Sequence, residues 1–257
     1  MALKKALFLH TQKTAGTSVT ELAWANYGHG NVMSHDDFLR FDDDAIDRTP
    51  FLSGHFGFGF ARERMAQRYA FTFLREPVER LLSLYSFCRG QTTDAYPIYA
   101  AARSLPLDKF LVAWQQLTGI EKIIYRETIW NHQAWQLCFG WMRDVYNPDR
   151  VTAFHFSEAA LLTNAQVNLL RFDHVGFTES FDMDLATIAK ELGLTVGERS
   201  PRANATERRV RLDELPASTV GLLRSFTELD NELYAKALAM RRSSFPSTQP
   251  DHPSSAK

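Results

Sequence analysis

The sequence predicts an α/β fold of three layers, in which a mostly parallel central sheet lies between two layers of helices. Short apolar runs such as 70–74 alternate along the chain with longer segments whose apolar residues recur at helical spacing, such as 181–193. Strands that alternate with helices are typical of a parallel sheet covered on both faces. Polar residues follow three of the apolar runs, and sheets of this class bind ligands beyond the carboxyl ends of their strands.

Length and composition limit the classes of protein to which the chain can belong. With 257 residues, 45% of them hydrophobic, it can bury the core of one large domain, expected over 1–242. The Ser/Pro-rich residues 243–257 are expected to form a disordered tail. A net charge of −1 gives no reason to expect nucleic acid as a partner. With no signal peptide and no run of roughly 20 apolar residues, we expect a soluble, cytoplasmic protein without a membrane span.

The first strand is expected over 5–9 and the first helix over 17–27, and the turn between them is rich in polar side chains. It carries Lys13, Gly16 and three hydroxyl residues (Thr14, Thr17 and Ser18). Backbone N–H groups at a helix N-terminus favour bound anions and the lysine adds a full charge, so phosphate is the expected ligand. The turn is not a Walker A loop, because no glycine precedes Lys13. On these residues alone, an ordinary turn with a surface lysine remains an alternative.

A second strand-turn-helix unit follows further along the chain. The acidic segment 35–48 is expected to be a solvated surface loop. A strand over 51–55 ends at Gly54 and His55, and a helix is expected from there to about residue 68. The buried strand 70–74 ends at Arg75, and Pro77 suits the first turn of the next helix, which contains Ser83.

The rest of the chain completes the alternation. A loop with a short helix is expected over 89–106, a strand over 151–156, a helix from the capping Ser157 to Arg171, and a strand over 174–177. Further helices are expected over 107–117, 129–142, 181–193 and 213–241, the last with a break near 225–227. The basic stretch 198–211 is expected to lack regular structure. Cys88 and Cys138 stand in no metal or redox spacing and are expected to be buried free thiols.

Three of these positions are expected to meet in space. Lys13, His55 and Arg75 each follow the carboxyl end of a predicted strand, and these ends share one edge of a parallel sheet. We therefore predict one crevice that contains all three side chains.

The combined pattern resembles the sulfotransferase superfamily, over roughly residues 5–240. Lys13-Thr14-Ala15-Gly16-Thr17-Ser18 is similar to its P-loop-like 5′-phosphosulfate-binding loop. The stretch 73–85 is similar to its 3′-phosphate-binding element, with Arg75 and Ser83 at the matching spacing of eight. Ser53-Gly54-His55-Phe56 resembles a motif of carbohydrate sulfotransferases of the heparan sulfate 2-O type. Those enzymes carry an N-terminal membrane anchor, and no membrane span is expected in this chain. It therefore resembles a bacterial-type soluble relative of them.

The resemblance implies that a sulfuryl group moves in line from 3′-phosphoadenosine 5′-phosphosulfate to a hydroxyl of a carbohydrate or a small molecule, with no metal. Lys13 would neutralise the leaving group, and His55 would be the general base. The 5′-phosphate would be held by the loop (Lys13, Thr14, Ala15, Gly16, Thr17 and Ser18). Arg75 and Ser83 would hold the 3′-phosphate. The net charge and the acidic segment 35–48 argue against a heavily sulfated glycan as the acceptor.

Two alternatives remain at this point. A P-loop phosphotransferase or nucleotide hydrolase would place Lys13 on a triphosphate, but it needs magnesium ligands, and no predicted strand ends in a suitable Asp. A non-catalytic nucleotide-binding protein would keep the fold without turnover. The basic stretch 198–211 could cover a bound nucleotide.

Overall fold

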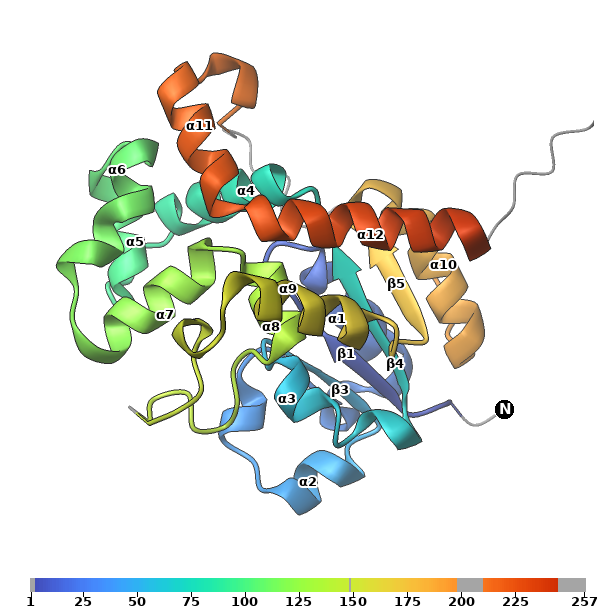
Figure 1. The fold of residues 1–257 in the computed structure, drawn as a ribbon. Coiled ribbons are helices and arrows are strands. Elements are labelled where there is room, and N and C mark those ends of the chain that lie inside the picture. Colours follow the sequence, from blue (N-terminus) through green and yellow to red (C-terminus); the bar gives the residue numbers. More distant parts are fainter. Residues whose placement is uncertain (1–2, 148, 198–209, 245–257) are drawn as a thin grey trace, which may run out of the picture.

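A parallel sheet forms the centre of the computed structural model, which describes residues 3–147, 149–197 and 210–244. In these residues the sheet has five strands in the order β2-β3-β1-β4-β5 (Figure 1). The strands are β1 (Ala6–Leu9), β2 (Val32–Met33), β3 (Phe51–Gly54), β4 (Tyr69–Leu74) and β5 (His174–Phe177). All of their pairings are parallel, which confirms the predicted fold class.

The order of the strands places a crevice beside β1. The chain leaves β1 toward β2 and β3 on one side, and then crosses to β4 and β5 on the other. Such a reversal is where open α/β sheets bind ligands. Leu9 is in register with both Gly54 and Thr72, so the segments after β1 and β3 leave the sheet together, and β4 runs two residues further.

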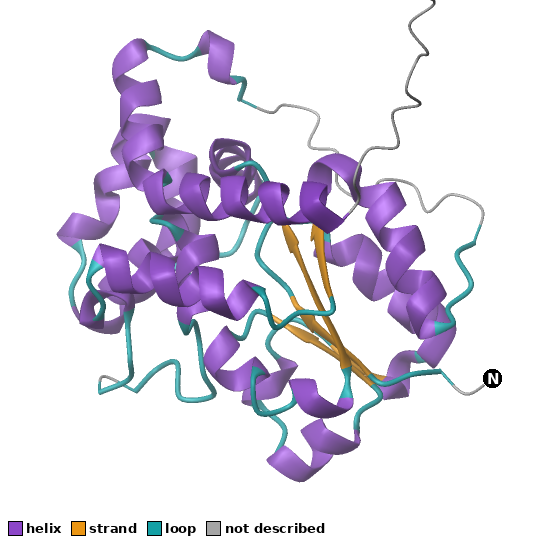
Figure 2. Ribbon diagram, turned by 45° about the vertical axis from the view of Figure 1, so that its right-hand side comes forward, coloured by secondary structure: helices purple, strands orange, loops and turns teal. Residues whose placement is uncertain are grey.

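Helices cover both faces of the sheet (Figure 2). Alternate side chains of β1 point to opposite faces, as the pleat requires. Ala6 and Phe8 pack with α1 (Gly16–Tyr27) and α10 (Phe181–Leu192). Leu7 and Leu9 belong to the other core, formed with α3 (Phe58–Ala61), α8 (His132–Cys138), α9 (Glu158–Leu169) and α12 (Glu228–Ser244).

A group of helices with its own core stands beside the sheet, on the left of Figure 1. It consists of α4 (Pro77–Arg89), α5 (Pro97–Ser104), α6 (Leu107–Val112), α7 (Gly119–Ile129) and α11 (Ala217–Phe226). Leu81, Phe110 and Leu223 are fully buried there. Because α4 begins directly after β4, this group forms a second wall for any ligand at the carboxyl edge of the sheet.

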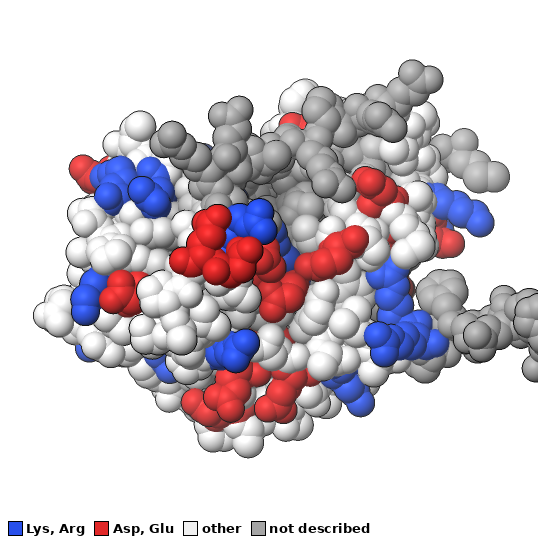
Figure 3. Space-filling model, turned by 90° about the horizontal axis from the view of Figure 1, so that it is seen from above, with Lys and Arg blue, Asp and Glu red and all other residues white. Residues whose placement is uncertain are grey.

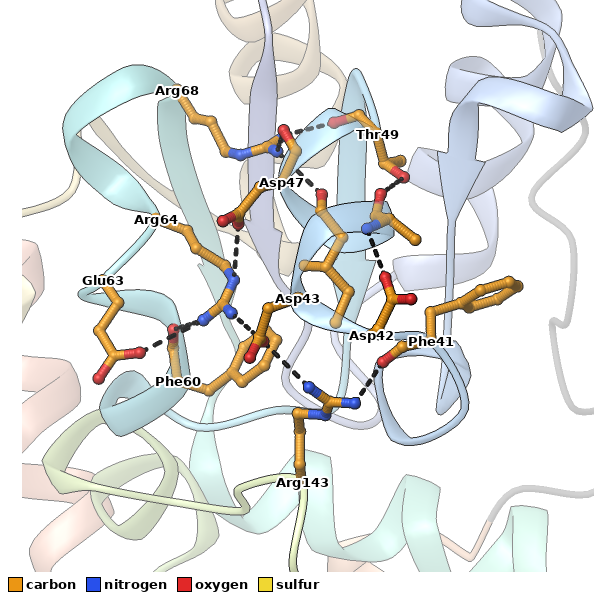
Figure 4. Close-up of polar contacts among 12 residues, drawn as sticks. Phe41, Asp42, Asp43, Asp47, Thr49, Phe60, Glu63, Arg64, Arg68 and Arg143 are labelled. Carbon is orange, nitrogen blue, oxygen red and sulfur yellow. Dashed lines mark hydrogen bonds and ion pairs between the residues drawn. The ribbon is translucent and has the colours of Figure 1, made fainter.

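The acidic segment 35–48 is partly helical, where we expected a solvated loop. Residues 43–48 form the helix α2 (Asp43–Arg48), and Asp42 caps it by accepting the N–H of Ala45 at 2.7 Å. Asp43 accepts from Arg64 at 2.6 Å and from Arg143 at 3.0 Å (Figure 4). The Arg68 guanidinium donates to carbonyls at the end of the helix (Ile46, Asp47 and Thr49). Guanidinium groups from outside the segment therefore hold the helix, and its own composition does not reveal them.

Other elements differ from the prediction in informative ways. No strand forms over 151–156, because Thr152 caps a short 3₁₀ turn (Ala153–His155) and the N–H of Ala153 donates to the buried Glu127 carboxylate at 3.0 Å. The helix expected up to residue 68 is the single turn α3 followed by a 3₁₀ turn (Met65–Gln67), and the helix expected over 129–142 is shorter. The prediction missed α7 and β2.

The predicted helix break is confirmed, because Thr227 separates α11 from α12. The expected tail begins two residues inside α12, and its remainder, 245–257, lies outside the described residues, as does 198–209 of the basic stretch. Both cysteines are buried free thiols, as expected. No helix in the described ranges has the length and hydropathy needed to cross a membrane.

Candidate functional site

A cavity of about 1580 Å³ lies at the carboxyl edge of the sheet, between the sheet and the helical group. Eight of the nine predicted site residues line it, and they come from three distant parts of the chain. Those that line it are Lys13, Ala15, Gly16, Thr17, Ser18, His55, Arg75 and Ser83. The predicted convergence is therefore confirmed. Thr14 alone of the predicted set does not line the cavity.

The loop after β1 has a backbone shape that suits an anion. Lys13 and Ala15 both adopt the left-handed conformation, with φ of 69° and 67°. For residues with a Cβ this costs about 1–2 kcal/mol each, and such strain concentrates at functional sites. Ala15 is the N-cap of α1 and has no side chain that could accept a hydrogen bond. The first N–H groups of a helix have no carbonyl partner within the helix, and Gly16, Thr17 and Ser18 of the first turn of α1 line the cavity.

Two neighbours fix the loop from within. The Thr14 hydroxyl donates to the carbonyl of Thr11 at 2.7 Å, so it holds the turn and does not point to the cavity. The His10 ring covers Gly16, where an added Cβ would lie only 1.8 Å from the imidazole Nε2. Position 16 therefore accepts only glycine while His10 keeps this place.

Lys13 is a partly buried cation. Its Nζ lies 4.1 Å above the centre of the Phe87 ring, a cation–π contact. The pKa of Lys13 is lowered to about 8, mainly because of burial and also because of the nearby Arg75 and Arg80 guanidinium groups. At neutral pH the ammonium is still the main form, but a bound anion would stabilise it.

The side chain of Gln133 fixes the backbone of Arg75. Gln133 Oε1 accepts the N–H of Arg75, and Gln133 Nε2 donates to the carbonyl of Arg75, both at 3.0 Å. The side chain of Arg75 extends toward the loop after β1. The guanidinium Nη1 donates to the carbonyl of Lys13 at 3.1 Å. The Arg75 guanidinium is also close enough to the Lys13 ammonium to lower its pKa, and Ser83 of α4 lines the same cavity.

His55 has a defined tautomer. Its Nδ1 lies 3.1 Å from the carbonyl oxygen of His10, which can only accept, so Nδ1 carries the proton and Nε2 keeps its lone pair. Burial lowers the pKa of His55, and the neighbouring His35 and Lys13 lower it further, against an opposing effect of Asp36. The ring is therefore neutral at pH 7. A neutral imidazole with a lone pair at Nε2 can take a proton.

The helix α8 positions these groups, and sequence reasoning missed most of its role. Gln136 donates through Nε2 to the carbonyls of His10, His55 and Phe56, at 3.1, 3.3 and 3.0 Å. Asp230 of α12 accepts the N–H of Ala134 at 2.7 Å, at the start of α8. The sequence did contain a signal of this role. Gln133 and Gln136 stand among apolar residues and, being three positions apart, lie on one face of a helix.

A second buried network borders the cavity. The Glu127 carboxylate is fully buried and accepts from Trp141 Nε1 at 2.9 Å and from the Arg150 guanidinium. Burial raises the pKa of Glu127, while the Arg150 charge opposes this. Trp141 in turn lines the cavity. Nothing in the local sequence around these residues indicates the network.

Among the described side chains, no group of three or more His, Cys, Asp or Glu residues is arranged to hold a metal ion. The site instead combines backbone N–H groups, two cations and a neutral imidazole. Such a set can bind phosphate groups and stabilise negative charge that develops during group transfer.

Comparison with known families agrees with this geometry. The model of the family described as "Sulfotransferase family" matches residues 3–237, nearly the whole chain. No curated protein sequence matches closely enough to supply a relative of known activity. The matched region contains every residue of the site, and the chain therefore belongs to the sulfotransferase family.

Proposed function

We propose that the protein transfers a sulfuryl group from 3′-phosphoadenosine 5′-phosphosulfate to an acceptor hydroxyl, with His55 as the general base. The observation that carries the proposal is the meeting of Lys13, Arg75 and His55 in one cavity at the strand reversal. The family membership supports sulfuryl transfer in general. The donor and the residue roles are inferred from the chemistry of the side chains.

The loop and Lys13 would bind the 5′-phosphosulfate end of the donor. The N–H groups at the start of α1, with the hydroxyls of Thr17 and Ser18, offer donors for phosphate oxygens. Lys13 would neutralise the charge that develops on the leaving phosphate oxygen. Its lowered pKa supports this role, because the cation gains most from an anion where water is excluded.

Arg75 and Ser83 would bind the 3′-phosphate. The planar guanidinium suits a phosphate, and its backbone is fixed on both sides by Gln133. The contact of Arg75 with the carbonyl of Lys13 keeps the two phosphate sites in a fixed relation. Fixed positions matter here because positioning supplies much of the rate in transfers of this type.

His55 would take the proton of the acceptor hydroxyl at Nε2. The His10 carbonyl fixes its tautomer, and its lowered pKa keeps it neutral at the pH of the cell. His55 also belongs to the stretch Ser53-Gly54-His55-Phe56, which resembles the motif of the heparan sulfate 2-O type. That likeness, and a covering role for the basic stretch 198–211, stay predictions.

Calorimetric titration tests the donor site directly. We expect the protein to bind 3′-phosphoadenosine 5′-phosphate with a micromolar dissociation constant, on the order of −8 kcal/mol, in the presence of a chelator. Arg75→Ala removes a charge-assisted contact and should weaken binding by at least about tenfold. Arg62→Ala is the matched control, because Arg62 is exposed and does not line the cavity.

A parallel titration with ATP and Mg²⁺ separates the proposal from its alternatives. Binding of ATP–Mg²⁺ without binding of the bisphosphate would overturn the sulfotransferase proposal in favour of a phosphotransferase. Binding of the bisphosphate, with no transfer to any acceptor and no effect of His55→Ala, would indicate a non-catalytic nucleotide-binding protein.

A further inference from the structure

One wall of the cavity is a row of aromatic side chains that leads away from Lys13. The row consists of Phe87, Tyr99, Tyr96 and Tyr146, and we call it the aromatic wall. Lys13 Nζ lies over Phe87, and the ring centroids of Phe87 and Tyr99 are 6.3 Å apart. The ring centroids of Tyr99 and Tyr96 are 5.4 Å apart. Burial raises the pKa of the Tyr96 phenol, and Tyr146 lies close enough to Tyr96 to raise it as well. The wall therefore leads from the proposed reacting end toward Tyr146, which is 59% exposed.

The aromatic wall is uncharged and partly open to a ligand. Burial raises the pKa of Tyr99 to about 12, so its phenol stays neutral at physiological pH. Phe87 and Tyr96 each keep 38% of their surface exposed although they contact neighbouring rings. Large aromatic surfaces of this kind stabilise a bound ring system by burial and stacking.

Within the described ranges, four acidic side chains line the cavity: Asp36, Glu121, Glu179 and Asp182. Asp36, from the segment after β2, acts electrostatically on Tyr96 and Tyr99 of the aromatic wall, and Glu121 comes from α7. Glu179 acts in the same way on Arg75, at the proposed phosphate end. Of the lining residues that the structure describes, Lys13 and Arg75 are the only Lys or Arg, and both belong to the proposed phosphate end.

The basic residues of α7 point elsewhere. Lys122 lies over Trp114 at 5.6 Å, and Arg126 lies over Trp130 at 4.0 Å; neither lines the cavity. On the face above the carboxyl edge of the sheet, the Lys and Arg side chains drawn in colour form no continuous band and alternate with acidic ones (Figure 3). A polyanionic chain would need a continuous band of this kind, and the side chains drawn in colour do not supply one.

We propose that the acceptor is an uncharged hydroxyl compound with an aromatic or aliphatic ring system, which packs on the aromatic wall and presents its hydroxyl to His55. Asp36 and Glu121 would disfavour anionic acceptors. In the transfer, the acceptor oxygen forms a bond to sulfur and its proton passes to Nε2 of His55. The bond between sulfur and the phosphate oxygen breaks, and Lys13 neutralises the electron pair left on that oxygen. The inference rests on the proposed function and names its substrate class.

A matched pair of acceptors tests it. 2-Naphthol and 6-hydroxy-2-naphthoate share a ring system and a hydroxyl, and differ by one carboxylate. We expect kcat/KM with the phosphosulfate donor to be at least about tenfold higher for 2-naphthol, because a carboxylate near Asp36 and Glu121 is repelled. Binding of both compounds to the protein saturated with 3′-phosphoadenosine 5′-phosphate should show the same preference by calorimetry.

Two variants assign the effect to residues. Tyr96→Ala should raise the KM for 2-naphthol several-fold while the affinity for the bisphosphate stays unchanged. Phe41→Ala is the control, since Phe41 is 44% exposed and lies outside the cavity lining. Asp36→Asn should lower the ratio of kcat/KM for 2-naphthol to kcat/KM for 6-hydroxy-2-naphthoate, because it removes one of the two charges that repel the carboxylate.

The outcomes separate this inference from the proposed function. Equal or better binding of 6-hydroxy-2-naphthoate, or transfer to desulfated heparan sulfate and not to 2-naphthol, overturns the uncharged acceptor and leaves the sulfotransferase proposal standing. Failure of the protein to bind the bisphosphate overturns the proposed function itself.

Discussion

Titration of Lys13 should appear as a descending limb in the pH profile of kcat/KM. The pKa of Lys13 is about 8 because the ammonium is largely withdrawn from water beside Arg75. The charged form then falls from about nine-tenths at pH 7 to about one-tenth at pH 9. If only the ammonium stabilises the leaving group, kcat/KM for the donor should fall about tenfold for each pH unit above 8.

The lowered pKa of Lys13 also predicts that the descending limb shifts when the donor is bound. Lowering the pKa of Lys13 from 10.5 to about 8 corresponds to about 3 kcal/mol of lost stabilisation of the ammonium. A bound phosphosulfate restores much of this, because it supplies negative charge at the site. The limb in kcat, which reports the bound state, should therefore lie at a higher pH than the limb in kcat/KM.

The assay is release of 3′-phosphoadenosine 5′-phosphate at saturating acceptor, from pH 6 to 10. Lys13→Arg keeps the charge over this range, so it should remove the descending limb even where it lowers the rate. Lys109→Arg is the matched control, because Lys109 is exposed on α6. Cys88 does not produce the limb, since burial raises the pKa of its thiol to about 12. A profile that stays flat from pH 7 to 9, or a limb that persists in Lys13→Arg, would refute the reasoning.

Three further predictions concern single residues. His55→Gln should lower kcat by ~10²-fold or more and leave bisphosphate binding unchanged, so an active variant would remove the assignment of the base. Gly16→Ala should displace the buried His10 ring, lowering the free energy of unfolding by about 1–3 kcal/mol in urea and weakening bisphosphate binding; a neutral result would show that the ring moves freely. Glu127→Gln should lower the free energy of unfolding by about 3 kcal/mol, because it leaves the buried Arg150 without its charge partner. A loss below about 1 kcal/mol in the urea titration would contradict that reading.

Short-range signals carried much of the fold and the two turns that bring Lys13 and Arg75 to the cavity. The strand-turn-helix units around Lys13 and Arg75 are legible because each joins an apolar run to a polar turn and a helical stripe within about 25 residues. The strand expected at 151–156 does not form, because a contact with a distant residue decides the local structure there. Its sequence suits a strand, but the N–H of Ala153 donates to Glu127, a residue far away along the chain.

By itself, then, the sequence determined the α/β alternation, the two polar turns at Lys13 and Arg75 and the likeness to the sulfotransferase family that the family match supports. Only the tertiary structure decided how the groups act. The tautomer of His55 depends on the His10 carbonyl, and Gln136 reaches that carbonyl from 126 positions along the chain. The aromatic wall joins α4 to residues of two other segments. Such contacts depend on packing between elements, and local propensity and periodicity carry no information about them.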